Sequence, residues 1–92
     1  MRVRFSGKFN KTYDKAPYKI RDAFDTRLKL FLENPYHPQL NNHLLGGKYR
    51  GYRSINVTGD WRAIFSQQQQ QEEDDRLVTI FEVIGTHSQL YK

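Results

Sequence analysis

The chain has 92 residues and a mass of 11.0 kDa, enough for one domain, and its 14% aromatic content is too high for a disordered chain. It has no cysteine, which excludes disulfides and cysteine-based metal sites, and no run of about 18 apolar residues, which excludes a membrane span. Since it also shows no apolar leader segment, we expect a cytoplasmic protein. The net charge is +5, and residues 1–66 alone hold 13 basic and 5 acidic side chains. This excess indicates a polyanionic partner such as nucleic acid, although charge that serves only solubility would explain it equally well.

The N-terminal third predicts one strand followed by two helices. Alternation of charged and apolar residues over 2–6 is typical of a short strand, and Ser6 can cap a short helix after it. A second helix is expected from Pro17 to about Glu33, with Asn34 ending it because a residue before proline is disfavoured in the α conformation. Apolar residues recur at helical spacing along one face of this helix: Ile20, Ala23, Phe24, Leu28 and Phe31.

The rest of the chain predicts a loop followed by three strands. Residues 35–47 are turn-forming residues with three leucines, and Tyr52–Val57 and Trp61–Phe65 alternate as the two strands of a hairpin. Gln67–Asp75 is of low complexity and predicts a solvated hairpin loop. Leu77–Ile84 is almost continuously β-branched or aromatic, as expected of a central strand covered on both faces. The order β-α-α-β-β-β predicts an α+β domain with two N-terminal helices packed on one face of an antiparallel sheet.

Polar residues gather where the predicted strands end, and they suit one type of chemistry. His43 opens a basic segment, Asp60 lies at the tip of the hairpin, and His87 follows the last strand. Cutting RNA without a metal ion needs a base for the 2′-hydroxyl, an acid for the leaving 5′-oxygen and fixed cations beside the phosphate. Imidazole and carboxylate groups suit proton transfer at neutral pH, and Arg or Lys suits the phosphate. No phosphate-binding glycine loop, metalloprotease motif or metal-ligand spacing of the histidines is present.

Most of these side chains, taken one at a time, also fit a structural role. His87 fits one least well, since it follows a buried strand and a glycine turn. Each of the other residues would be explained by a place in a loop or turn, in the core, or over the surface of the sheet. These residues are His37, His43, Arg50, Arg53, Asp60, Trp61 and Phe65.

Two motifs resemble the RelE/ParE superfamily of bacterial type II toxins, and they are most similar to its YafQ-like branch of mRNA interferases. The motifs are His43-x-Leu-x-Gly-x-Tyr-x-Gly-Tyr-Arg53 through Gly59-Asp60-Trp61-Arg62, and Gly85-Thr86-His87-Ser88-Gln89-Leu90-Tyr91. The resemblance implies a single RelE-like domain over residues 1–92. It also implies a ribosome-dependent endoribonuclease that cuts mRNA in the A site, needs no cofactor or metal, and is neutralised by a cognate antitoxin.

The resemblance also implies roles for particular residues. The catalytic set would be His43, Asp60, His87 and Tyr91, and the RNA contacts would be Lys48, Arg50, Arg53 and Arg62. Asn56 stands where YafQ-like proteins carry a further histidine on the first hairpin strand, and asparagine cannot exchange protons near neutral pH. Acid and base catalysis would then depend on His43 and His87. The Gln67–Asp75 segment looks like an insertion.

Two other functions stay open on the sequence. The first is that of ParE-like toxins, which share this fold, act on DNA gyrase and need no catalytic histidine. The presence of a histidine in the terminal motif disfavours this function. Alternatively, the chain is a non-catalytic RNA-binding or antitoxin-sequestering relic of the fold, with Asn56 as a first sign of decay. For an antitoxin, we expect an acidic, helical segment that covers the helical face and the basic groove, with Glu72–Asp75 outside its footprint.

Overall fold

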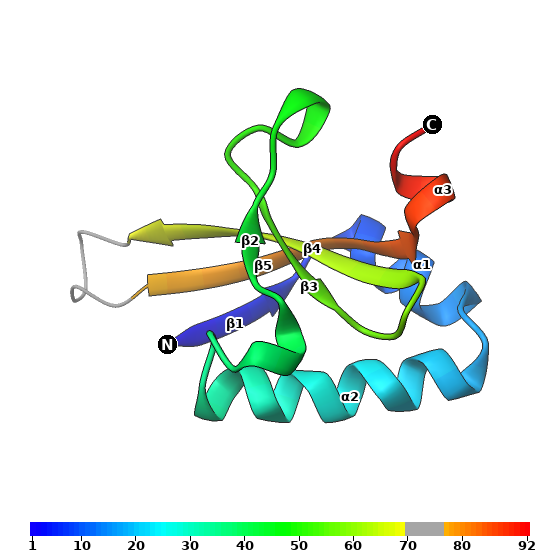
Figure 1. Cartoon of the computed structure of the whole chain (residues 1–92), viewed down its shortest axis with the longest axis horizontal. Helices are drawn as coiled ribbons and strands as arrows, with labels where there is room; N and C mark the ends of the chain where they lie inside the picture. The colour runs from blue at the N-terminus through cyan, green and yellow to red at the C-terminus, as the bar shows by residue number, and fades with distance from the viewer. Residues whose placement is uncertain (70–76) are drawn as a thin grey trace.

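The computed structural model describes residues 1–69 and 77–92, and within them five strands form one sheet with helices on both faces (Figure 1). The elements in chain order are β1 (Arg2–Phe5), α1 (Gly7–Lys15), α2 (Tyr18–Glu33), the 3-10 helix η1 (Pro38–Leu40), β2 (His43–Leu44), the 3-10 helix η2 (Gly47–Tyr49), β3 (Arg53–Asn56), β4 (Trp61–Gln69), β5 (Leu77–Thr86) and α3 (His87–Leu90). The predicted α+β class with two N-terminal helices is confirmed. The structure adds β2 and α3, which the sequence pattern did not predict.

The sheet is mixed rather than wholly antiparallel, because β1 pairs with β5 in parallel. The strand order is β1-β5-β4-β3-β2, with Arg2 opposite Val78 and Phe5 opposite Phe81, while the other neighbouring strands are antiparallel. Parallel strands need a long connection, and here all of α1 to β4 separates β1 from β5 in the chain. β5 is therefore an inner strand, as its apolar run predicted.

The larger core lies between the sheet and the helices α1 and α2, and phenylalanine rings make up much of it. Phe24 and Phe31 of α2 are buried, and the rest of the predicted apolar stripe packs against the same core. The rings of Phe24 and Phe81 meet edge to face, with centroids 5.3 Å apart. Burial of each such ring contributes about 1.5–3 kcal/mol, so this core fixes both helices on one face of the sheet.

Helix α1 lies beside β5 at the point where β1 has ended. Ser6 caps α1 as predicted, since its hydroxyl accepts the N–H of Phe9 at 3.0 Å, and it also donates to the carbonyl of Glu82 at 2.9 Å. Farther along α1, the hydroxyl of Thr12 accepts the N–H of Ile84 at 3.2 Å. These two hydroxyls satisfy backbone groups on the edge of β5 that β1 leaves uncovered.

A smaller core lies on the opposite face of the sheet, under α3 and the segment between β2 and β3. In Figure 1, α2 lies below the sheet, whereas α3 and this segment stand above it. Alternate residues of a strand point to opposite faces, so β4 and β5 contribute to both cores. The buried residues of this second core are Ile64, Val83 and Leu90, with Leu45, Tyr49 and Tyr52 packed against them.

Two predicted loops contain regular structure. Gln67–Gln69 belong to β4, where they pair with the β5 residues 77–79, because backbone pairing with an apolar strand does not require apolar side chains on the partner. The remainder of the predicted Gln67–Asp75 loop lies outside the described residues. Residues 35–47 contain η1 and β2 and reach the start of η2, with Leu40 fully buried. Among the described helices, none has both the length and the apolar character that crossing a membrane requires.

Candidate active site

His87 is the first residue of α3, and its side chain is exposed. A capping box holds this helix: the Thr86 hydroxyl accepts the N–H of Gln89 at 3.1 Å, and the Gln89 side-chain oxygen accepts the N–H of Thr86 at 2.9 Å. The N–H of His87 donates to the carbonyl of Asp60 at 3.0 Å. The helix therefore starts directly at the end of β5 and is tied to the turn between β3 and β4.

A row of aromatic rings connects α3 with the segment between β2 and β3. The rings of His87 and Tyr91 have centroids 4.8 Å apart at 37°, and Tyr91 meets Tyr49 edge to face at 5.6 Å and 84°. Tyr49 in turn meets Tyr52 at 6.4 Å, and the Nζ of Lys48 lies 5.2 Å from the centroid of the Tyr49 ring. We call His87, Tyr91, Tyr49 and Tyr52 the aromatic strip.

Tyr49 and Tyr52 are members of this site that the sequence reasoning missed. Burial, together with the charge that Tyr91 can carry, raises the pKa of Tyr49 above its ordinary value near 10. Tyr49 therefore remains a neutral hydroxyl at physiological pH. The signal that could have found these residues is the interleaving of tyrosine with lysine and arginine over 48–53, a pattern typical of surfaces that bind single-stranded RNA.

Asp60 is exposed in the turn between β3 and β4, and Arg62 binds the carbonyls of that turn. The Nη1 of Arg62 donates to the carbonyls of Thr58 at 2.9 Å, Trp61 at 3.1 Å and Gly59 at 3.2 Å. Nη2 donates to the Gly59 carbonyl as well, at 3.2 Å. Much of the guanidinium of Arg62 thus stabilises the turn that carries Asp60, which gives this residue a structural role beside its predicted contact with RNA.

His43 lies on β2, on the face of the sheet that α3 covers. The register places His43 opposite Ser54, Ser54 opposite Ile64 and Ile64 opposite Val83, and residues paired in this way share a face. Three strand spacings of about 4.8 Å separate the backbones of His43 and Val83 by roughly 14 Å. The Nδ1 of His43 lies 2.7 Å from the carbonyl oxygen of Asn41. Because a carbonyl only accepts, Nδ1 carries the proton and Nε2 of the neutral ring keeps a free lone pair.

Asn56 lies on this same face, opposite Arg62, which is itself opposite Gly85. The Oδ1 of Asn56 is buried and, within residues 1–69 and 77–92, has no hydrogen-bond partner, and the same is true of the Ser54 hydroxyl. A buried acceptor without a partner costs about 1–3 kcal/mol. The fold therefore gains nothing from the amide oxygen at position 56.

The remaining predicted cations divide between two places. Lys48 and Arg50 are exposed on either side of Tyr49 in the chain, beside the aromatic strip. Arg53 is directed elsewhere: its Nε donates to the Oδ1 of Asn42 at 2.8 Å, and its guanidinium carbon lies 5.7 Å from the ring centroid of Tyr36. The structure thus places Lys48 over the Tyr49 ring, leaves Arg50 exposed next to Tyr49 in the chain, and holds Arg53 away from the strip.

His37 has the structural role that its place before a proline predicted. Its Nδ1 accepts the N–H of Gln39 at 3.1 Å and so caps η1. In the part of the chain that the structure describes, no three His, Asp or Glu side chains are grouped closely enough to hold a metal ion.

The whole chain is similar to known bacterial toxins. The model of the family "Bacterial toxin of type II toxin-antitoxin system, YafQ" matches residues 1–92. The chain is 28% identical over 93 residues to the mRNA interferase toxin YafQ of Escherichia coli strain K12, covering 97% of this chain and 94% of that protein. The crystal structure of YafQ from E. coli BL21(DE3) superposes with a TM-score of 0.78 at 24% identity, covering 100% of both chains. YafQ in the E. coli DinJ-YafQ toxin-antitoxin complex gives a TM-score of 0.70 at 25% identity, covering 98% of this chain and 96% of that one.

The fold and the family match over the whole chain therefore define a bacterial toxin of a type II toxin-antitoxin system. Within that class, the chain belongs to the YafQ family of toxins from type II toxin-antitoxin systems.

Proposed function

We propose that this toxin is an mRNA interferase, an endoribonuclease that cuts ribosome-bound mRNA in the cytoplasm and so inhibits translation. The observation that carries the proposal is the exposed His87–Tyr91 pair, with ring centroids 4.8 Å apart, next to a basic and tyrosine-rich segment. A proton-transfer group beside a cationic, aromatic surface is the combination that cleavage of single-stranded RNA requires. The similarity to a toxin named as an mRNA interferase supports the same activity.

The reaction that these residues suit is an internal transfer of the phosphate. A base removes the proton from the 2′-hydroxyl, and the 2′-oxygen forms a bond to phosphorus. The bond from phosphorus to the 5′-oxygen breaks, and an acid protonates that oxygen as it leaves. The products are a 2′,3′-cyclic phosphate and a free 5′-hydroxyl, so the proton taken from the substrate is balanced by the proton returned to it.

The proton-transfer roles are assigned from the contacts of each ring. His43 is suited to be the base, because its Nδ1–H is bonded to Asn41 and its Nε2 can take a proton. His87 is suited to be the acid, because its exposed ring lies beside that of Tyr91 and its backbone N–H is bound to the turn that carries Asp60. RNA would have to lie between β2 and α3 to meet both histidines, across the face that carries the aromatic strip.

Positive charge for the phosphate would come from both sides of Tyr49. Lys48 and Arg50 are exposed there, and a fixed cation stabilises the extra charge on phosphorus in the transition state. Arg53 and Arg62 remain proposed contacts to the RNA backbone, although both already make hydrogen bonds within the fold.

The experiment that tests the proposal is induction of the chain in a bacterium, followed by mapping of mRNA 5′ ends and a gyrase supercoiling assay. We expect new 5′ ends within translated messages, and cleavage in a purified system only when ribosomes and mRNA are both present. Loss of gyrase supercoiling without new 5′ ends would instead identify a ParE-like inhibitor. Neither effect, with RNA binding retained, would identify a non-catalytic relic.

For the partner, we propose an antitoxin with an acidic, helical segment that covers the basic face of the toxin. The similar YafQ chain is known in a toxin-antitoxin complex, and the net positive charge of residues 1–66 favours an acidic partner. Co-expression with the neighbouring gene should yield a complex whose formation slows at high salt. Replacing Glu72, Glu73, Asp74 and Asp75 by serine should leave the complex intact; loss of the antitoxin from this variant would contradict the proposed footprint.

A further inference from the structure

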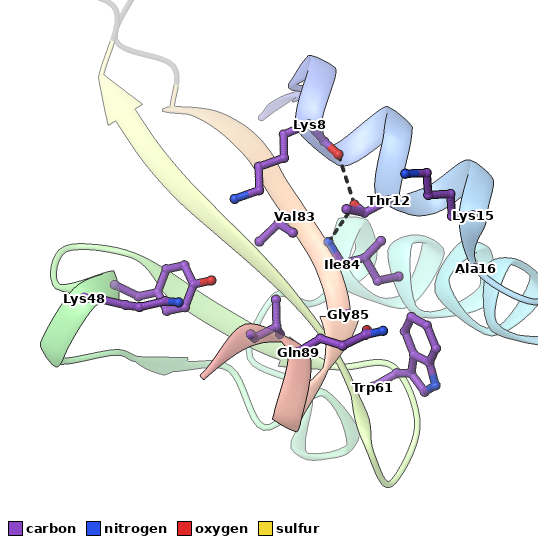
Figure 2. Close-up of a pocket in the computed structure, with 12 residues that line it drawn as sticks. Lys8, Thr12, Lys15, Ala16, Lys48, Trp61, Val83, Ile84, Gly85 and Gln89 are labelled. Atoms are coloured by element: carbon purple, nitrogen blue, oxygen red, sulfur yellow. Dashed lines mark hydrogen bonds between the residues drawn. The ribbon is translucent and has the colours of Figure 1, made fainter. Parts of the chain in front are cut away.

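A cavity of about 390 Å³ lies between α1, the end of β5 and α3 (Figure 2). It exists because β1 ends before β5 does, so that α1 lies along the free edge of β5 and leaves a space under α3. The hydroxyl of Thr12, which donates to the Lys8 carbonyl at 3.1 Å and accepts from Ile84, fixes the wall that α1 forms. The floor is apolar, made by Val83, Ile84 and Leu90.

The charge around this cavity is all of one sign. Lys8 and Lys15 line it from α1, and Lys48 lines it from η2, whereas none of its described lining residues is Asp or Glu. Lys8 extends from α1 toward Val83 (Figure 2). Three ammonium groups around an apolar floor attract an anion, and no carboxylate among the described lining residues neutralises them.

The other lining groups suit a nucleotide base. Trp61 presents an indole ring to the cavity and Gln89 presents a side-chain amide, and both lie at the α3 end (Figure 2). An aromatic ring can stack on any base, and the Nε2 of Gln89, whose Oε1 accepts the N–H of Thr86, can donate a hydrogen bond at a base edge. Lys48 and Tyr49 also line the cavity, and Tyr49 is the ring that contacts Tyr91. The cavity therefore borders the aromatic strip at Tyr49.

We propose that this cavity is a second binding site for single-stranded RNA, which holds a nucleotide outside the pair that is cut, with its phosphates on Lys8 and Lys15 and its base against Trp61. The inference rests on the proposed function, since it extends the RNA path from the histidines across Tyr49 to α1. Cationic grooves with aromatic platforms are the general means of binding single-stranded RNA. An acidic peptide would use the lysines but would not stack on the indole ring, which favours RNA.

The single tryptophan of the chain makes the test direct, because Trp61 lines this cavity and its fluorescence responds to a ligand bound there. The probe is an oligoribonucleotide of about six residues with 2′-O-methyl groups, which binds but cannot be cut. The cavity variant is Lys8→Gln/Lys15→Gln. The control variant is Lys11→Gln/Lys19→Gln, which removes the same charge from exposed lysines of α1 and α2 that do not line the cavity.

We expect the oligonucleotide to change the fluorescence of Trp61 in the wild type and in the control variant. The cavity variant should bind about tenfold or more weakly, and the slope of log K against log salt should fall by about 0.7 for each phosphate that the variant no longer neutralises. Unchanged fluorescence in the wild type, equal weakening in both variants, or wild-type affinity in the cavity variant would each overturn the proposal. Normal RNA binding by the cavity variant together with loss of the antitoxin would assign the cavity to an acidic peptide instead.

A second arm distinguishes the two sources of RNA. If the nucleotide belongs to the message, the cavity variant loses affinity for the oligonucleotide but binds ribosomes without mRNA as the wild type does. If it belongs to ribosomal RNA, the variant also loses affinity for these empty ribosomes; either result supports an RNA site. Binding of the uncleavable probe is measured separately from cleavage of mRNA, so the cavity can be correct even if the proposed reaction is not.

Discussion

The backbone N–H of His87 donates to the carbonyl of Asp60 at 3.0 Å, so a residue at the end of the last strand is tied to the turn between β3 and β4. This bond places two predicted site residues, which are distant in the chain, next to each other through the backbone. It also means that a change in the turn is transmitted to α3. The site therefore depends on the packing of α3 as well as on its own side chains.

Replacing His87 by alanine should lower mRNA cleavage about 10²- to 10⁴-fold, the usual effect of losing a general acid or base. The side chain is exposed, so the melting temperature should change little. His43→Ala should show a smaller loss, because RNA can still be positioned without it. The matched control is His37→Ala, which removes a cap from η1 and should lower stability but leave cleavage unchanged. Near-normal cleavage by a folded His87→Ala protein would contradict the assignment.

Replacing Asn56 by histidine should raise the rate of cleavage by about 10- to 100-fold, since it adds a third imidazole to the face that carries His43. Asn56→Ala serves as the control and should leave the rate unchanged, at little or no cost in stability, because it removes a buried acceptor that has no partner among the described residues. Primer extension on a translated message measures both variants. If Asn56→His cleaves no faster than the wild type, a missing histidine is not what limits this toxin.

Arg62→Ala should reduce the free energy of unfolding by about 1–3 kcal/mol, because its guanidinium holds the carbonyls of the turn at 58–61. For a domain of this size, each kcal/mol corresponds to a fall in melting temperature of about 4–8 °C. Arg50→Ala, at an exposed position, should leave the melting temperature unchanged. The opposite result for Arg62→Ala, unchanged stability with weaker and less salt-dependent binding to ribosomes, would make Arg62 chiefly a phosphate contact.

Gly85→Ala should displace α3 and weaken cleavage. A Cβ at this position would lie 3.2 Å from both the Gln89 Oε1 of the capping box and the Leu90 Cδ2 of the second core. Accommodating such close neighbours costs about 1–3 kcal/mol, measured as a lower melting temperature. Gly59→Ala is the control, because a Cβ there meets nothing within 4 Å. A Gly85→Ala protein with wild-type stability and cleavage would show that α3 is not held as closely as its packing indicates.

The stability of the toxin should fall in alkaline solution because of two tyrosines. Burial and the hydrogen bond to Asp25 raise the pKa of Tyr13, and burial and Tyr91 raise that of Tyr49. Since the folded state then holds these protons more tightly than the unfolded state, their contribution is complete below about pH 10 and is lost as the pH rises through the folded pKa. Thermal melts of Tyr13→Phe/Tyr49→Phe should show a shallower decline above about pH 10 than the wild type. The variant Tyr18→Phe, at an exposed position, should lose stability with pH as steeply as the wild type. An equally steep decline in the double variant would show that Tyr13 and Tyr49 do not cause the alkaline loss of stability.

Several elements could be predicted from the sequence because their cause is local. The apolar stripe of α2, the Ser6 cap and the β-branched run of β5 are set by residues within a few positions of one another, and each was found where it was expected. The contact between His87 and Tyr91 was not among these predictions, because it depends on α3, which the sequence pattern did not predict.

The chain alone thus determined the class of fold, the apolar face of α2 and the family to which the protein belongs. Only the tertiary structure decided that β1 pairs in parallel with β5, that α3 builds a second core on the other face of the sheet, and that Lys8 and Lys48 line one cavity. These relationships join residues about 30 to 80 positions apart in the chain. Their formation depends on the free energy of packing the whole domain, which no local pattern of side chains records.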